Sequence, residues 1–140
     1  MTRELVTVDE LNLLQMDQYT ELLEESRDEP MFYGKALDPK RPRQIVLDEE
    51  DNVVGAFEFT RTYWEGTYYW RANRPYVLKK YRGRGLMVPA LRFWFLNRRP
   101  ALAWIDEENI ASIRLFFSLG FSKDKPGVMH GKQGHFYVLH

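Results

Sequence analysis

The sequence predicts an α/β domain with a mixed, largely antiparallel central sheet flanked by helices. Three observations predict this class: strand-like segments are the more numerous, three of them follow one another across short turns, and helical segments separate the later ones. The expected order is β, α, three β, α, β, α, β, β. With 140 residues and no linker or repeat, the chain is expected to form one domain over residues 1–140.

The first half is expected to form a strand, a helix and three successive strands. Thr7-x-x-Glu10 is a capping box, and leucines at helical spacing follow it. An acidic turn joins two β-rich runs into a hairpin, and Gly66 precedes a third strand. Pro75 removes an N–H from that strand, so a bulge or an unpaired strand end is expected there. The expected elements are a strand around Val6 and Val8, a helix to about Ser26, and strands at 44–47, 53–61 and 67–78.

The second half alternates helices and strands. Pro89 is compatible with a buried helix because it lies in the first turn, where its missing N–H has no helical partner. Gly120 suits the left-handed position after a helix end. The expected elements are helices at 86–97 and 109–119, and strands at 102–105, around Phe121 and at 136–139.

Composition excludes several kinds of site. The chain has no cysteine, so disulfides, thiolate catalysis and Cys-based zinc sites are excluded, and its three histidines crowd the last eleven residues, so no metal centre is expected. No apolar run reaches the roughly 20 residues of a membrane helix, and the first residues lack a signal-peptide pattern. We therefore expect a cytoplasmic protein without a membrane partner.

The zero net charge conceals a division of charge along the chain. Residues 1–30 have a net charge of −7, whereas residues 66–105 contain nine basic residues and no acid. The basic block indicates an anionic ligand.

A glycine loop within this block is the strongest functional signal. Gly83 and Gly85 follow an expected strand and precede an expected helix, so backbone N–H groups and a helix N-terminus would face one anion such as a pyrophosphate. The loop matches neither of two other phosphate-binding motifs. The Gly-Lys-Ser/Thr of a P-loop is missing, and Val88 occupies the position of the third glycine in a dinucleotide-binding fingerprint. A basic turn on a solvated surface is the alternative interpretation.

The loop and a later helix together resemble the GNAT superfamily of acyl-CoA N-acyltransferases. Val77-Leu-Lys79-Lys-Tyr81-Arg82-Gly83-Arg-Gly85 is similar to motif A, Val-x-Pro-x-Tyr-Arg-Gly-x-Gly. Asn109 and Gly120-Phe121 match an Asn-led helix closed by Gly-Phe, as in motif B. The resemblance implies a fourth and fifth strand that splay apart, and acetyl-CoA as co-substrate without a metal.

The resemblance also implies roles for individual residues. The N–H groups of Arg82–Met87 would hold the CoA pyrophosphate, and the backbone of Val77–Lys79 would pair with pantetheine. A backbone N–H near Leu78 would polarise the thioester carbonyl. The cofactor-binding residues so implied are Val77, Leu78, Lys79, Lys80, Arg82, Gly83, Arg84, Gly85, Leu86, Met87, Asn109, Ser112 and Phe116; Lys79, Lys80 and Arg84 are the candidates for the 3′-phosphate. For Asn109, capping of its helix is a second interpretation, compatible with the first.

The standard acid and base of the family have no counterparts. The fourth strand carries no glutamate before Val77, and Phe116 stands where the family has a tyrosine. Glu58 and Asp106 are the candidate bases, with a solvated strand carboxylate as the other interpretation of Glu58. The remaining candidates are His130 and His135 as bases, and Tyr33, Tyr76 and Tyr137 as acids, beside ordered water in either role.

Two function classes therefore stay open. The first is an N-acetyltransferase that transfers the acetyl group of acetyl-CoA to a primary amine of a small molecule or protein by direct attack. The second is a GNAT-fold module that binds CoA or a protein with little turnover, as the missing acid and base suggest. Nucleic acid is a disfavoured third partner because the acidic first helix would repel a long polyanion. A homodimer is compatible with the fold, but no motif specifies it.

Overall fold

A computed structural model describes residues 4–29 and 40–140 of the chain. The chain divides into two compact units, one made of Met1–Thr60 with Ala72–Phe93 and the other of Arg61–Arg71 with Trp94–His140. The elements are β1 (Glu4–Val6), η1 (Val8–Glu10), α1 (Leu13–Ser26), β2 (Arg43–Leu47), β3 (Val53–Trp64), β4 (Thr67–Val77), η3 (Lys79–Tyr81), α2 (Met87–Trp94), η4 (Phe95–Asn97), β5 (Ala101–Asp106), α3 (Ile110–Ser118), β6 (Ser122–Met129) and β7 (Lys132–Leu139), where η denotes a 3₁₀ helix.

The expected class is confirmed: the strands form a seven-stranded, mostly antiparallel sheet in the order β1-β2-β3-β4-β5-β7-β6. The pair β4 and β5 is parallel, with Trp70 opposite Ala101 and the Trp70 N–H donating to the Pro100 carbonyl at 2.9 Å. The expected order of elements is confirmed as well.

The N-terminal capping signal caps a different element from the one expected. The Glu10 carboxylate accepts the Thr7 N–H at 2.9 Å, but this box begins the short helix η1. The long helix α1 begins at Leu13 with a second box, in which Asn12 and Gln15 exchange hydrogen bonds at 2.8 and 3.0 Å. The sequence contains both signals, and the one at Thr7 begins η1 instead of the long helix.

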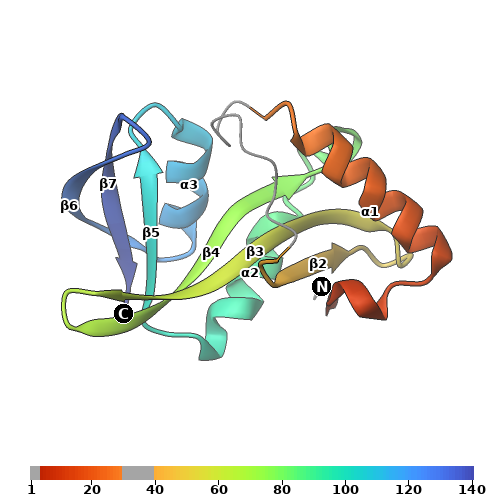
Figure 1. Ribbon diagram of the computed structural model, residues 1–140, viewed down its shortest axis with the longest axis horizontal. Helices are drawn as coiled ribbons and strands as arrows, with labels where there is room; N and C mark the ends of the chain where they lie inside the picture. Colours follow the sequence, from red (N-terminus) through yellow and green to blue (C-terminus); the bar gives the residue numbers. More distant parts are fainter. Residues whose placement is uncertain (1–3, 30–39) are drawn as a thin grey trace. The chain divides into compact units, whose positions relative to one another are not determined.

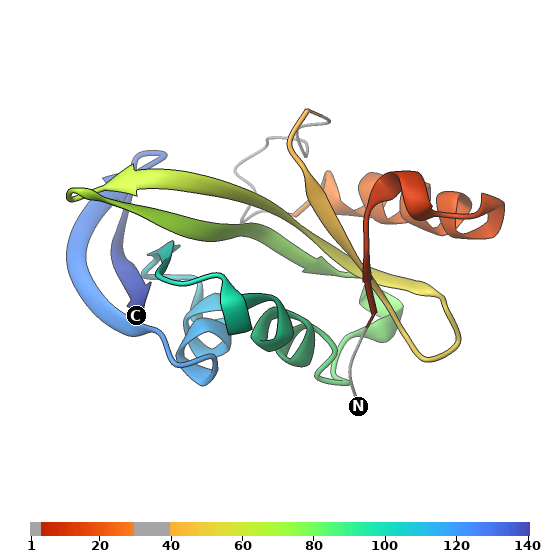
Figure 2. The same ribbon diagram turned by 90° about the horizontal axis from the view of Figure 1, so that it is seen from below.

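In the first unit, helices cover both faces of the sheet, with α1 on one face and α2 on the other (Figure 2). Residues from α1 and four strands form one core against α1: Val6, Tyr19, Leu22, Ile45, Leu47, Val53, Ala56, Tyr76 and Leu78. On the opposite face a Cβ at Gly55 would lie 2.8 Å from the Tyr76 carbonyl oxygen and 3.2 Å from the methyl carbon of Met87 in α2. The neighbouring residues Gly55 and Ala56 therefore point to opposite faces of β3, Gly55 toward α2 and Ala56 toward α1.

The β3–β4 connection and the kink in β4 follow from backbone conformation. Glu65 and Gly66 have φ values of 49° and 85°, as a tight two-residue hairpin turn requires. Arg74, just before Pro75, has φ 51°, so β4 departs from regular strand geometry where the sequence predicts an irregularity.

In the second unit, β5, β7 and β6 pair as successive antiparallel strands (Figure 1). Four aromatic rings form its core, with centroid separations of 5.0 Å for Trp94–Phe95, 5.3 Å for Phe95–Phe121 and 5.0 Å for Phe116–Phe121. All three contacts are edge-to-face, the arrangement that aromatic quadrupoles favour.

Candidate functional site

The glycine loop between β4 and α2 has the backbone form that an anion site needs. Gly83 and Gly85 have φ values of 81° and 64°, which favour glycine over any other residue. A Cβ built on either glycine meets no atom within 4 Å, so the space beside the loop is open. In the described part of the chain, none of the N–H groups of residues 83–86 donates to a backbone carbonyl. These N–H groups and the N-terminus of α2 can together hold a phosphate.

Some basic side chains of the loop pair with carboxylates, and others remain available to bind an anion. Lys80 Nζ lies 3.4 Å from the Glu21 carboxylate, and Arg82 lies 3.9 Å from the Glu29 carboxylate. Arg82 also donates from Nε to the Val77 carbonyl at 2.9 Å, so its guanidinium folds back over the strand end. Arg84 stacks over the Tyr81 ring at 5.4 Å and has no carboxylate partner among residues 4–29 and 40–140. Arg84 is therefore the side chain best suited to meet a phosphate.

An acidic row at the end of α1 and just beyond it accounts for part of the division of charge in the sequence. Glu21, Glu25 and Glu29 follow one another at four-residue spacing. Glu21 pairs with Lys80, Glu29 pairs with Arg82, and Glu25 lies between them. The acidic N-terminal segment thus neutralises two cations of the basic block, and the remaining positive charge is smaller than the sequence count suggests.

Glu25 is a functional candidate that the sequence reasoning missed. Its Oε2 accepts hydrogen bonds from the Tyr76 hydroxyl at 2.7 Å and from the Lys79 N–H at 2.9 Å. Burial by itself raises the pKa of Glu25, but these two hydrogen bonds, with Lys79 and Arg82 nearby, outweigh burial and lower it. Burial and the Glu25 carboxylate raise the pKa of Tyr76. The four-residue spacing of the three glutamates was the signal that could have found it.

The oxyanion role expected of Leu78 does not fit this hydrogen-bond pattern. The Leu78 N–H donates to the Val54 carbonyl of β3 at 2.9 Å. The next N–H, that of Lys79, donates to Glu25. The role of an N–H near Leu78 at a thioester carbonyl stays a prediction, and it would require this hydrogen bond to Val54 to open.

Glu58 is neither a solvated strand carboxylate nor an exposed base. Its side chain is 0% exposed, and its carboxylate lies 3.9 Å from Arg43 and 3.5 Å from Arg74. Arg43 in turn donates to the Tyr19 hydroxyl at 2.9 Å. Strand alternation places Glu58 on the face that α1 covers, and this burial is what the sequence reasoning missed.

In the second unit, Asp106 and Asn109 hold the start of α3. Asp106 Oδ1 accepts the Glu108 N–H at 2.9 Å, and the Asn109 side chain accepts the Ser112 N–H at 3.2 Å. This arrangement agrees with the capping interpretation of Asn109. Ser112 is half-buried, whereas Phe116 is buried against Phe121 in the core.

The other expected acids and bases are dispersed or not described. Tyr137 is buried in β7, His135 lies opposite Ile105, and the His130 ring lies 6.2 Å from that of Trp104. Tyr33 falls outside the described residues. Within residues 4–29 and 40–140, no group of three or more potential ligands could hold a metal ion.

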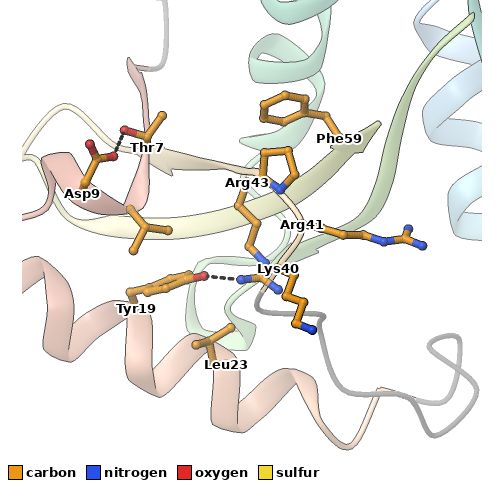
Figure 3. A pocket seen from close by; sticks show the side chains of 10 residues that line it. Thr7, Asp9, Tyr19, Leu23, Lys40, Arg41, Arg43 and Phe59 are labelled. Carbon is orange, nitrogen blue, oxygen red and sulfur yellow. Dashed lines mark hydrogen bonds between the residues drawn. The ribbon is translucent and has the colours of Figure 1, made fainter. Parts of the chain in front are cut away.

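A separate cavity of about 570 Å³ lies in the first unit against α1 (Figure 3). Its walls combine apolar side chains with the Arg43–Tyr19 hydrogen bond. The ten lining residues are Thr7, Val8, Asp9, Tyr19, Leu23, Lys40, Arg41, Pro42, Arg43 and Phe59. None of them belongs to the glycine loop, so the cavity and the loop are distinct features.

Among the described residues, no helix has the length and apolar composition needed to cross a bilayer. A comparison with curated proteins found no match.

Solved structures similar to this chain are acetyltransferases at low sequence identity. One is a histone acetyltransferase HPA2-related protein from Corynebacterium glutamicum, at 12% identity, TM-score 0.70, and coverage of 99% of this chain and 96% of that one. An acetyltransferase from Thermus thermophilus is 21% identical, with TM-score 0.62 and coverage of 99% and 97%. The NatC complex bound to a Gag peptide and CoA contains a chain at 16% identity, with TM-score 0.63 and coverage of 99% and 97%. These similarities show a common fold.

The family comparison is more specific than the common fold. The model of the acetyltransferase (GNAT) family matches residues 8–121, a stretch that includes both the glycine loop and the Asn109 helix. The chain therefore belongs to the GNAT acetyltransferase family, which implies transfer of an acyl group from acyl-CoA.

Proposed function

We propose that this protein is an N-acetyltransferase that transfers the acetyl group of acetyl-CoA to a primary amine of a small molecule or protein by direct attack. The observation that carries the proposal is the glycine loop, with open space at Gly83 and Gly85 and unpaired N–H groups before α2. The family of the chain supplies the reaction class.

The residues of the loop fit the phosphates of CoA. Of the N–H groups from Arg82 to Met87, those of residues 83–86 would hold the pyrophosphate because the Arg82 N–H donates to the Lys79 carbonyl. Arg84 with Lys79 would meet the 3′-phosphate. Lys80 and Arg82 are less suited because Lys80 pairs with Glu21 of α1 and Arg82 pairs with Glu29 just after that helix. The backbone of Val77–Lys79 would pair with pantetheine once the hydrogen bonds of the Leu78 and Lys79 N–H groups to Val54 and Glu25 are exchanged.

Glu25 is the carboxylate that we propose as proton acceptor in place of Glu58. Bound acetyl-CoA supplies the thioester carbonyl that the amine attacks, and CoA thiolate leaves. The bound ammonium first gives one proton to Glu25 and becomes the attacking amine. When the C–S bond breaks, a second N–H proton passes to the leaving thiolate, so CoA is released as the thiol and Glu25 returns its proton to water. Both hydrogen bonds that Glu25 accepts from the described residues go to its Oε2. Oε1 would therefore be left for the ammonium. Its lowered pKa keeps Glu25 ionised at neutral pH.

Calorimetric titration with CoA tests the cofactor site. Wild-type protein should bind CoA at micromolar concentration, and Gly85→Glu should abolish binding because a carboxylate then occupies the anion site. Gly66→Glu is the matched control, since Gly66 also has positive φ and open space but lies in the hairpin turn. Absence of heat with both CoA and acetyl-CoA, or an equal loss in the control, would contradict the proposal.

A CoA- or protein-binding module with little turnover is the second candidate function. Burial of Glu58 between two arginines favours it, as does the absence of any acid in residues 66–105. Thiol release from acetyl-CoA with benzylamine, spermidine and a lysine-containing peptide separates the two candidates. Transfer above background supports the enzyme, whereas intact CoA binding with background transfer supports the module.

The same assay tests Glu25. Glu25→Gln should lower kcat by at least about tenfold while CoA affinity stays within about twofold, because the amide keeps the hydrogen-bond acceptor but not the base. Equal loss of CoA affinity and of kcat would instead make Glu25 an anchor of the loop.

A further inference from the structure

The hairpin in the second unit carries a row of alternating aromatic rings and arginines. The Tyr63 and Tyr68 rings are 5.0 Å apart, and the guanidinium of Arg61 lies 5.7 Å from the Tyr68 centroid. The row continues through Trp70, whose ring lies 4.9 Å from Arg61 and 5.9 Å from Arg98. It ends at Trp94, 4.9 Å from Arg98. We call these six residues the ladder: Tyr63, Tyr68, Arg61, Trp70, Arg98 and Trp94.

Strand periodicity explains how the ladder forms. Arg61 and Tyr63 are two residues apart on β3, and Tyr68 and Trp70 are two apart on β4, so each pair points to one face of its strand. The tight turn at Glu65 and Gly66 brings the two pairs together across the hairpin.

The outer end of the ladder is exposed. Tyr63 and Tyr68 retain 61% and 58% of their accessible surface, and Arg61 is exposed as well. Exposed tyrosine and arginine side chains of this kind are enriched at protein interfaces relative to the remaining surface.

The arginines of the ladder have no carboxylate partner in the described part of the chain. Within residues 4–29 and 40–140, Arg98 donates to the Trp94 carbonyl and to Asn97, and Arg61 lies over the rings of Tyr68 and Trp70. A nearby cation of the same unit differs, because Lys125 pairs with Glu65. The ladder therefore has uncompensated positive charge.

Stacking determines which chemical group these guanidinium groups can still bind. A guanidinium that stacks on an aromatic ring contacts the ring with its flat face. The N–H groups in the plane of the guanidinium remain available as hydrogen-bond donors. A carboxylate binds in that plane, with two parallel hydrogen bonds. A nucleobase would need a free ring face, and Arg61 already lies over one face of the Tyr68 and Trp70 rings.

We propose that the ladder is a docking surface for an acidic polypeptide segment, whose carboxylates bind Arg61 and Arg98 while its backbone lies along Tyr63 and Tyr68. Charge complementarity and in-plane guanidinium donors carry this inference. It goes beyond acyl transfer and does not depend on it, because no ladder residue belongs to the glycine loop.

Fluorescence anisotropy with labelled peptides tests the proposal in about 50 mM salt, where surface charges are weakly screened. The probes are (Glu-Gly)5, its neutral counterpart (Gln-Gly)5 and the single strand dT10. Arg61→Gln is the test variant. Arg84→Gln and Arg114→Gln make the same change of charge in the glycine loop and on the exposed side of α3.

Wild-type protein should bind (Glu-Gly)5 saturably and at least about tenfold more tightly than (Gln-Gly)5. Arg61→Gln should weaken that binding by at least about fivefold, whereas both control variants should stay within about twofold. Arg61→Lys should recover only part of the affinity because an ammonium lacks the planar fork.

Three results would overturn the proposal. The first is no saturable binding of (Glu-Gly)5, which would leave the ladder as a device that only stabilises the hairpin. The second is an equal effect of Arg84→Gln and Arg61→Gln, which would place binding at the glycine loop or make it non-specific. The third is tighter binding of dT10, which would identify a nucleic-acid surface. Thermal unfolding of each variant confirms that it is folded.

Discussion

The carboxylate of Glu25 accepts a hydrogen bond of 2.7 Å from the hydroxyl of Tyr76, 51 residues later in the chain. This contact joins the last turn of α1 to the last residues of β4, where the glycine loop begins. The same oxygen accepts the first N–H of η3, at Lys79, which has no partner within its own helix. The acidic helix thus fixes the entry of the loop that we propose to bind CoA.

A double-mutant cycle measures the strength of the Glu25–Tyr76 contact. Glu25→Ala should lower the free energy of unfolding by about 1–3 kcal/mol, because it leaves the Tyr76 hydroxyl and the Lys79 N–H without their acceptor. Tyr76→Phe should cost about 0.5–1.5 kcal/mol. The double variant, measured by urea denaturation, should cost less than the sum by about 0.5 kcal/mol or more, as expected for residues in contact. Additive effects would show that the hydrogen bond contributes nothing to stability.

The pH dependence of stability should reveal the ionised form of Glu25. Because its pKa is lowered from 4.5 in the folded state, its contribution is complete above pH 4.5 and is lost as the pH falls through the lower, folded value. Urea denaturation of wild type and Glu25→Gln should therefore show a stability difference that shrinks between about pH 5 and pH 3. A difference that stays constant over this range would contradict the assignment.

Tyr76 should give the opposite dependence at alkaline pH. Its pKa is raised from 10.0, so its contribution is complete below pH 10 and is lost as the pH rises through the higher, folded value. The stability difference between wild type and Tyr76→Phe should therefore be constant from pH 7 to 9 and shrink only above pH 10. A decrease that begins near neutral pH would contradict the raised pKa.

The elements of the fold were predictable because their signals are local. Gly66, Pro75 and Gly120 each act through the conformation of their own backbone, and the structure gives them a turn, a kinked strand and a left-handed φ of 95°. The glycine loop was predictable for the same reason. The error at the first capping box is also local, since two boxes lie within nine residues and only the second begins α1.

The environments of the carboxylates were not predictable from the sequence. Glu58 pairs with Arg43 and Arg74, which are 15 and 16 residues away in the sequence and lie on the two neighbouring strands. No local sequence pattern shows which faces of these three strands are buried together. Glu25 meets residues more than 50 positions away. The pairing of the basic block with acidic residues depends on such long-range contacts. A count of charges in the sequence therefore overestimates the positive charge that the glycine loop offers to an anion.

Gly134 of β7 is predicted to be intolerant of any side chain. A Cβ there would collide with the Ile105 carbonyl and would lie 2.7 Å from the Trp104 ring. Because a strand carbonyl cannot move aside cheaply, Gly134→Ala should lower the free energy of unfolding by about 1–3 kcal/mol or more. Gly131→Asn is the control, since Gly131 has φ 70° and no atom within 4 Å of its Cβ position. Equal stability of both variants in thermal unfolding would show that β7 shifts to accept the methyl group.

Glu58 is predicted to support the fold and not the reaction. Glu58→Gln removes the negative charge between Arg43 and Arg74 and should lower the free energy of unfolding by about 3–5 kcal/mol, because the buried guanidinium of Arg43 loses this carboxylate. Arg74→Met should cost less, since Arg43 still compensates the carboxylate and the Arg74 side chain is partly exposed. Below the unfolding temperature, the folded fraction of Glu58→Gln should keep wild-type kcat with acetyl-CoA and an amine acceptor. A stable variant with kcat reduced by about a hundredfold or more would instead return Glu58 to the role of base, and its burial would then require an opening of the first unit during turnover.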